Sequence, residues 1–249
     1  MTLIKFIGTG SLEGIPSPLC DCKVCKHARI GGRNKRYRSS MFLEFDDGNS
    51  LLIDCTPDFK QQLEEFRFSL ENIFISHGHI DHFLGIGEIS YLKALYGVNP
   101  KIYGKEDVMQ YCQSYFGFLK LDFISVEKKI KIGKNVLELI PVYHARNTST
   151  NGLLYRDTLI LPEVYTVEDD IIKYLKSKNI KRLICDAAYY DKALYDDHFT
   201  INQAIDLGKK IGAKEIILTN IWHKTKSHEE LSTEFEDVTF SYDGMELKF

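Results

Sequence analysis

Three of the eight histidines in the chain lie within six residues, in the stretch FISHGHIDHFLG. They are His77, His79 and His82, and Asp81 precedes the last of them. Imidazole nitrogens with one carboxylate suit Zn²⁺, Mn²⁺ or Fe²⁺. Four potential ligands exceed what one tetrahedral ion with an open position would take from one loop. The pattern therefore predicts two metal positions, with His77 and His79 at one and Asp81 and His82 at the other. A polar surface turn is the plainer alternative.

A second cluster of metal-ligand type contains Cys20, Cys22 and Cys25. Three thiolates at this spacing can surround one ion, and a closed set of three cysteines and one histidine is a standard structural zinc site. His27 and His228 are two of the histidines that could complete the set, although His27 lies so close to Cys25 that its chelate would be strained. Three buried thiols without a metal are the alternative interpretation.

The elements around the histidines would hold them at the end of a strand. The apolar run at residues 73–75 predicts a buried strand, and apolar residues at helical spacing from Phe83 to Leu95 predict a helix after it. A turn at a strand end is rigid on one side and open on the other, so it can hold ligands and still admit substrate.

Short strand-like runs and amphipathic helical patterns alternate along both halves of the chain. The strand-like runs are residues 3–7, 41–45, 50–53, 73–75, 136–141, 152–155, 159–161, 183–185, 215–218 and 238–242. Further helical patterns cover residues 57–66, 167–176 and 200–211, with Thr200 as the N-cap of the last. This arrangement favours two sheets with helices outside them over a single doubly wound sheet.

The bulk composition is that of a soluble globular protein. The chain has 249 residues, 44% of them hydrophobic and 27% charged, with a formal net charge of −3. That charge gives no global attraction to nucleic acid or to an acidic membrane, and no apolar run approaches the roughly 18 residues of a membrane helix. We see no signal peptide at the start. Clustered and singly buried cysteines suit a reducing compartment, so we expect a cytoplasmic location.

The stretch HGHIDH resembles the HxHxDH signature of the metallo-β-lactamase superfamily. Other stretches follow in the order seen in one branch of it: GTGSLEGIP, CDCKVC, RSSMFLEFDDG, LLIDC, VYH, DHFTINQA, LTNIWH and FSYDGMELKF. That branch holds PhnP-like phosphodiesterases, which cleave phosphoribosyl cyclic phosphate, and PqqB-like proteins of pyrroloquinoline quinone synthesis. The resemblance implies an α/β fold, a four-layer αβ/βα sandwich with the metals at one edge. It implies a single domain over residues 1–249, with a zinc-binding loop at about 15–40.

The resemblance also implies a ligand set. The first metal would bind His77, His79 and His144, the second would bind Asp81 and His82, and the cysteine cluster would take His223 as its fourth ligand.

Two positions depart from the phosphodiesterase pattern. Glu163 stands where a bridging aspartate is typical, and it keeps the carboxylate but adds a methylene. Asn220 stands where a final metal histidine is expected, and its neutral carbonyl oxygen is a weak ligand for zinc. We count both as candidate ligands, and we expect the second metal position to be weak, differently metallated or empty.

Candidate catalytic residues are His198 and Asp81. His198 matches a histidine proposed as general acid in the phosphodiesterases, where it would protonate the leaving oxygen. The alternative role for His198 is that of a residue at the start of a helix. Asp186, which ends an apolar run, either orients a metal histidine or accepts backbone hydrogen bonds.

These residues lead us to expect a metal-dependent hydrolase, most specifically a phosphodiesterase that acts on a small or cyclic phosphate ester through metal-activated water. Its cofactors would be one structural zinc and one or two zinc, manganese or iron ions at the histidines. A second hypothesis is a PqqB-like oxidase or hydroxylase with a single Fe²⁺ held by His77, His79, His144 and Glu163. A third is a protein of the same fold that binds ligand without turnover.

The expected partner is a small-molecule phosphate ester rather than nucleic acid or a membrane, and a homodimer is left open. The basic run from Arg33 to Arg38 is too short to grip RNA, although it could meet a phosphate. Glycines at 8, 10 and 14 lack the dinucleotide-binding pattern, so we expect that loop to line the rim of the active site.

Overall fold

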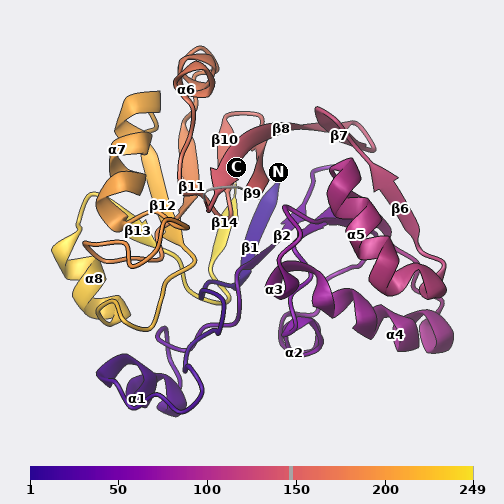
Figure 1. Ribbon diagram of the computed structural model, residues 1–249, viewed down its shortest axis with the longest axis horizontal. Coiled ribbons are helices and arrows are strands. Elements are labelled where there is room, and N and C mark those ends of the chain that lie inside the picture. The colour runs from indigo at the N-terminus through magenta and orange to yellow at the C-terminus, as the bar shows by residue number, and fades with distance from the viewer. Residues whose placement is uncertain (146–147, 249) are drawn as a thin grey trace.

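Two seven-stranded sheets pack face to face in the computed structural model, which describes residues 1–145 and 148–248 (Figure 1). Phe249, the last residue of the C-terminal stretch FSYDGMELKF, lies outside the described part of the chain. Apart from one helix on an N-terminal arm, the helices of the first half cover the outer face of one sheet and those of the second half cover the outer face of the other (Figure 1).

Each sheet joins an antiparallel part to a parallel part. In spatial order, the first sheet contains β14 (Glu246–Lys248), β1 (Leu3–Gly8), β2 (Ser40–Glu44), β3 (Ser50–Ile53), β4 (Asn72–Phe74), β5 (Lys101–Gly104) and β6 (Asp122–Ser125). The second contains β13 (Thr239–Phe240), β12 (Glu215–Thr219), β11 (Arg182–Asp186), β10 (Thr158–Leu161), β9 (Thr148–Tyr155), β8 (Asn135–His144) and β7 (Lys129–Ile132). Strands β3 to β6 are mutually parallel, and so are β10 to β13.

The helices are short. They are α1 (Lys23–Ile30), α2 (Phe59–Phe66), α3 (Ile80–Phe83), α4 (Ile89–Tyr96), α5 (Glu106–Phe116), α6 (Asp169–Lys176), α7 (Ile201–Ile211) and α8 (His228–Glu234), with 3₁₀ helices η1 (Leu84–Glu88) and η2 (Gly117–Leu119). Helix α1 projects from the body on an N-terminal arm (Figure 1). Among the described residues, no helix is long and apolar enough to cross a membrane.

Three apolar layers separate four layers of secondary structure. The inner layer joins the two sheets through residues such as Phe6 and Phe74 of the first and Leu153 and Ile184 of the second. A second layer lies between the first sheet and α2 to α5, and a third between the second sheet and α6 to α8. The predicted αβ/βα sandwich is therefore confirmed.

The helix predicted from Phe83 to Leu95 is wrong as one continuous element. It consists of α3, η1 and α4, and Leu95 is exposed. The cause is local packing at Gly85, whose N–H donates to the Cys55 carbonyl, and where a Cβ would come within 2.1 Å of the Thr56 carbonyl oxygen. Such close approach suits glycine, whose low helix propensity also favours the break. The prediction of Thr200 as N-cap of α7 is confirmed by its capping box with Gln203.

The sheets bring their carboxyl ends to one edge of the sandwich. Asp54 directly follows β3, His77 lies three residues beyond β4, and Asn220 directly follows β12. Ligand sites of open α/β sheets lie outside the carboxyl ends of the strands. This edge is where the polar side chains singled out from the sequence converge.

Candidate metal centre

The first group of possible metal ligands contains His77, His79, His144 and Glu163, with one ligand atom from each within 4.8 Å of the others. His77 and His79 come from the turn between β4 and α3, and Glu163 comes from the loop after β10. His144 is the last residue of β8, which extends three residues beyond the predicted end at residue 141.

The separations within this group match those around a single ion. His144 Nε2 lies 3.2 Å from His79 Nδ1 and 3.1 Å from Glu163 Oε2. His77 Nε2 lies 3.3 Å from the same Glu163 oxygen. A tetrahedral ion with bonds of about 2.0–2.1 Å holds its ligands about 3.3 Å apart. The four side chains are thus already spaced as ligands of one cation.

The imidazoles are oriented by their second nitrogens. His77 Nδ1 lies 3.0 Å from Ser76 Oγ, which donates to Asp54, and His144 Nδ1 donates to the Asp197 carbonyl oxygen at 2.6 Å. His77 Nε2 is a buried atom without a geometric hydrogen-bond partner among the described residues, although a Glu163 oxygen lies 3.3 Å away. Metal-ligating histidines are commonly tethered in this way, with the free nitrogen turned to the ion.

Burial lowers the pKa of His77, His79 and His144, and their neighbouring histidines lower it further. These imidazoles are therefore neutral, which is the form that binds metal.

The second group of possible ligands contains Asp81, His82 and Glu163. His82 Nε2 lies 2.9 Å from Glu163 Oε1 and 3.3 Å from Asp81 Oδ2. Glu163 thus presents one oxygen to each group, as a bridging carboxylate would. Burial alone would lower the pKa of His82. The negative charges of Glu163, Asp81 and Asp54 outweigh burial and raise that pKa well above its usual value. Three buried carboxylates around one imidazole require a positive charge, supplied either by a protonated His82 or by a metal ion.

Asn220 lies next to the second group, in contact with Glu163. Its Nδ2 donates to Glu163 Oε1 at 3.3 Å and to Asp186 Oδ1 at 3.2 Å, while its Oδ1 is buried without a partner among the described atoms. An amide N–H therefore faces the carboxylate oxygen that a second ion would use. The first group fits a metal ion well, and the second offers three donors and a competing amide.

His198 stands beside the first group. Its ring centroid lies 4.5 Å from that of His144, and its Nδ1 lies 2.7 Å from Asp186 Oδ2. Burial alone would lower the pKa of His198, but the carboxylates of Asp186 and Glu163 outweigh it and raise that pKa to about 10. Asp186 also accepts from the backbone N–H groups of Val164 and Ala188. It thus orients His198 as well as accepting backbone hydrogen bonds.

Asp54 is a site residue that the sequence analysis missed. Its carboxylate accepts from Ser76 N–H at 2.8 Å and lies 2.8 Å from His82 Nδ1, so it orients the second group. The residue adopts a left-handed conformation with φ of 61°. The signal in the sequence was an aspartate directly after the apolar run Ser50–Ile53.

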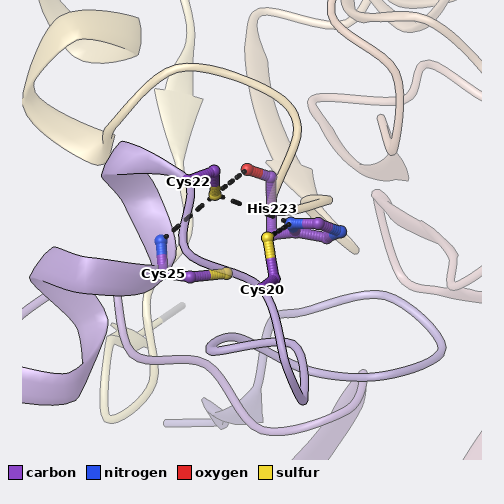
Figure 2. Close-up of side chains that lie close together, drawn as sticks. All are labelled: Cys20, Cys22, Cys25 and His223. Atoms are coloured by element: carbon purple, nitrogen blue, oxygen red, sulfur yellow. Dashed lines mark hydrogen bonds between the residues drawn. The ribbon is translucent and has the colours of Figure 1, made fainter.

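The cysteine cluster gathers Cys20, Cys22, Cys25 and His223 (Figure 2). His223 Nδ1 lies 3.3 Å from Cys20 Sγ and 3.7 Å from Cys22 Sγ. Bonds of about 2.3 Å to sulfur and about 2.0 Å to nitrogen place such atoms about 3.5 Å apart around zinc. Burial would raise the pKa of Cys22, but hydrogen bonds from the Cys25 N–H and from His223 lower it to about 6. Burial raises the pKa of Cys25 to about 12, so three thiolates here need a cation.

The other histidines considered for this cluster lie elsewhere. His27 is exposed, and His228 is buried with its Nδ1 3.3 Å from Arg36 Nη2. Within the basic run, Arg36 is buried and Arg38 pairs with Asp58 at 2.7 Å.

Comparison with known proteins identifies the family and the fold of the chain. A family model described as a β-lactamase superfamily domain matches residues 49–221. An octanoyltransferase of Porphyromonas gingivalis is 28% identical over an alignment of 252 positions, which covers 96% of this chain but only 50% of that protein. The chain thus spans about half the length of this relative.

Two solved structures share the fold over almost the full chain. A diphosphatase from the PhnP family has a TM-score of 0.89 at 24% identity, covering 100% of this chain and 98% of that one. Zn²⁺-bound PqqB from Methylobacterium extorquens has a TM-score of 0.74 at 16% identity, covering 99% of this chain and 100% of that one.

Proposed function

This chain belongs to the metallo-β-lactamase superfamily, and on that premise we propose that it is a metal-dependent phosphodiesterase acting on a small phosphate ester, cyclic esters included. The observation that carries the proposal is the position of His198. It lies directly beside a group of side chains spaced for a metal ion, with one ring nitrogen tied to Asp186. The likeness in fold to a PhnP-family diphosphatase agrees with phosphate chemistry.

The residues of the chain divide the work as follows. His77, His79, His144 and Glu163 would hold the main metal ion, and Asp81 and His82 would share Glu163 with a weaker one. When bound, the metal lowers the pKa of nearby water and offsets negative charge on the phosphoryl oxygens. The cysteine cluster with His223 would hold a structural zinc, because four protein ligands leave no position for substrate.

His198 would act as the general acid. Because its Nδ1 is held by Asp186 Oδ2 at 2.7 Å, its proton for transfer is the one on Nε2. Asp186 keeps the imidazolium oriented and charged until the leaving oxygen develops negative charge. Transfer of the Nε2 proton then neutralises that oxygen, and Asp81 remains with the metal ligands rather than in the proton transfer.

The proposal is tested by metal analysis and hydrolysis together. Protein purified without added metal is assayed with bis(p-nitrophenyl) phosphate, alongside His77→Ala and Cys22→Ser. We expect His77→Ala to lose metal from the histidine centre and at least about 100-fold in activity. Cys22→Ser should lose only zinc from the arm. Wild-type protein that holds metal but hydrolyses no phosphodiester, including nucleoside 2′,3′-cyclic phosphates, would contradict the proposal.

A second candidate is oxidative chemistry at a single Fe²⁺, as the PqqB-like resemblance suggests. It is favoured by Asn220, whose amide N–H faces the second metal position and leaves the first group as the stronger site. Iron as the one metal of the histidine centre, with oxygen consumption on an oxidisable precursor and no hydrolysis, would support this candidate. No metal at the histidines and no turnover would instead support a ligand-binding protein.

A further inference from the structure

A small pocket opens beside His198. It has a volume of about 200 Å³, and its walls include Leu12, Glu13, Tyr189, Tyr195, His198 and Trp222. Pockets for whole drug-sized ligands measure about 300–1,000 Å³. This pocket therefore accommodates one portion of a substrate whose reacting group lies at the metal centre.

Hydrogen bonds fix two of the aromatic side chains that line the pocket. Trp222 Nε1–H donates to Glu13 Oε1 at 2.9 Å, and the Tyr189 hydroxyl donates to Asp197 Oδ1 at 2.8 Å. The rings of Tyr189 and Trp222 lie 5.6 Å apart at 90°. Because the polar atoms already have partners, these rings offer the pocket apolar surface and π-faces rather than free hydrogen-bonding groups.

Apart from His198, the charged side chains that line the pocket are carboxylates. Among the described residues that line it, none is lysine or arginine, and the carboxylates are those of Glu13 and Asp197. Glu13 is engaged by Trp222 and by His223 Nε2 at 3.2 Å, while Asp197 is engaged by Tyr189. Two cations lie near the pocket without lining it. Arg38 Nε donates to the Leu12 carbonyl oxygen at 2.7 Å, and Lys224 Nζ lies 4.8 Å from the Trp222 centroid. A second phosphate or a carboxylate would therefore meet acidic side chains here.

Glu13 also ties the pocket to the cysteine cluster. Its carboxylate joins Trp222 to His223, whose other ring nitrogen faces the sulfurs of Cys20 and Cys22 (Figure 2). The loop that carries Glu13 and the residue that carries the indole are thus fixed to the same cluster. This tether orients the aromatic wall before any ligand arrives, which reduces the entropy cost of binding.

We propose that this pocket binds a planar, uncharged aromatic or heteroaromatic group, such as a nucleobase, on the leaving-group side of the phosphate ester. The inference rests on the proposed function, because His198 connects the pocket to the metal centre and would protonate the oxygen that departs into it. The substrate class is then a phosphate ester with one ring system near the scissile bond, rather than an ester of a bare sugar phosphate.

Two product-like probes isolate the contribution of the ring. Adenosine 5′-monophosphate and ribose 5-phosphate share their sugar and phosphate and differ in the base. We expect the metal-loaded protein to bind the first at least about tenfold more tightly in calorimetry, since bases stack well on aromatic side chains. Trp222 is the single tryptophan of the chain, so only the nucleotide should quench tryptophan emission strongly.

Substitutions in the pocket test whether the base binds there. Trp222→Leu should reduce the preference to within about threefold, and Tyr195→Leu, at an exposed rim position that does not threaten folding, should reduce it partly. Tyr96→Leu, at an exposed aromatic residue of α4, is the matched control and should keep the full preference. Zinc content and melting temperature verify that each variant is folded.

Equal affinities for the two probes, or a preference that survives in both pocket variants, would overturn the inference. Hydrolysis of bis(p-nitrophenyl) phosphate by the same preparations is scored separately. Hydrolysis with equal affinities overturns the aromatic pocket alone. A strong base preference without hydrolysis of any diester overturns the phosphodiesterase proposal and leaves the pocket as a binding site.

Discussion

At the scale of single residues, the expected affinity of each candidate metal position depends on which groups lie next to the two carboxylate oxygens of Glu163. Its Oε2 lies near His77 and His144, and its Oε1 lies near His82 and the Asn220 amide. One carboxylate thus meets two imidazoles on one side and an imidazole with an amide N–H on the other. Because of this asymmetry, we expect the two metal positions to differ in their affinity for metal.

Replacing Asn220 by histidine should strengthen the second position. Asn220 has a φ of 60°, a left-handed conformation in which histidine is also comparatively well tolerated. We expect metal at the histidine centre, measured by elemental analysis, to rise from about one toward two ions per chain. Asn220→Ala removes the competing N–H without adding a ligand, and an equal rise in that variant would show that the amide, rather than the missing ligand, limits the site.

Replacing His198 by glutamine should slow the reaction according to the leaving group. An alkoxide needs a proton to depart, so kcat for a nucleoside 2′,3′-cyclic phosphate should fall about 10²–10⁴-fold. A p-nitrophenolate departs without one, so kcat for bis(p-nitrophenyl) phosphate should fall less than about tenfold. Equal losses on both substrates would argue against a general acid and for a role of His198 in holding Asp186 or the metal ligands.

At the scale of elements, the N-terminal arm is fastened to the last part of the chain by a buried guanidinium. Arg36 donates to Thr9 Oγ1 at 2.7 Å and to the Ser241 carbonyl at 2.6 Å. Its Nη2 faces Nδ1 of His228, the first residue of α8, at 3.3 Å. Neutral His228 accepts this hydrogen bond, whereas a protonated ring would face a cation.

This contact predicts a loss of stability in weak acid. Burial, and then Arg36 and Arg33, lower the pKa of His228 from 6.5 to about 4. Between these values the unfolded chain binds more protons, so the contribution is full above pH 6.5 and is lost as pH falls toward 4. At pH 5 the loss is about 2 kcal/mol at most, or about 4–8 °C in Tm.

His228→Asn is the test of this prediction, because an amide oxygen can accept from Arg36 without titrating in this range. We expect the fall in Tm between pH 7 and pH 5 to be smaller in the variant than in the wild type. An identical fall would assign the acid sensitivity to other groups, such as the thiolates of the cysteine cluster.

At the scale of the whole molecule, the candidate metal centre draws its residues from both halves of the chain. The first half supplies His77 and His79 from the edge of one sheet, and the second supplies His144 and Glu163 from the edge of the other. A cation bound there holds the two sheets together at an edge where the sandwich otherwise contains buried, mutually repelling carboxylates.

Metal binding should therefore raise the stability of the whole fold. A ligand at 100 times its Kd stabilises by about 2.7 kcal/mol, or about 5–10 °C in Tm for a chain of this size. We expect Mn²⁺ to raise Tm in this way for the wild type and for Cys22→Ser, whose defect lies in the arm. His144→Ala should lose most of the gain, and a full gain in His144→Ala would place the stabilising ion elsewhere.

The parts of the fold with strong local patterns were predictable. The strand at Ser50–Ile53 and the start of α7 at its Thr200 N-cap agree with the sequence analysis. Strands β5, β6, β7 and β14 were missed, because each is three or four residues of mixed polarity whose pairing depends on neighbours distant in the chain. The helix after the histidines was misread because its glycines fit a tertiary contact that no periodicity reveals.

The sequence by itself determined the candidate ligands that are close in the chain, because a turn that brings residues 77 to 82 together needs no distant partner. Only the tertiary structure decided which side chains the carboxylates contact. Asp54 reaches His82 across 28 positions and Glu163 reaches it across 81, and Glu13 meets Trp222 across 209. The physical reason is that the carboxyl ends of parallel strands meet at one edge only after the two sheets pack on their shared apolar core, and distance along the chain does not encode that meeting.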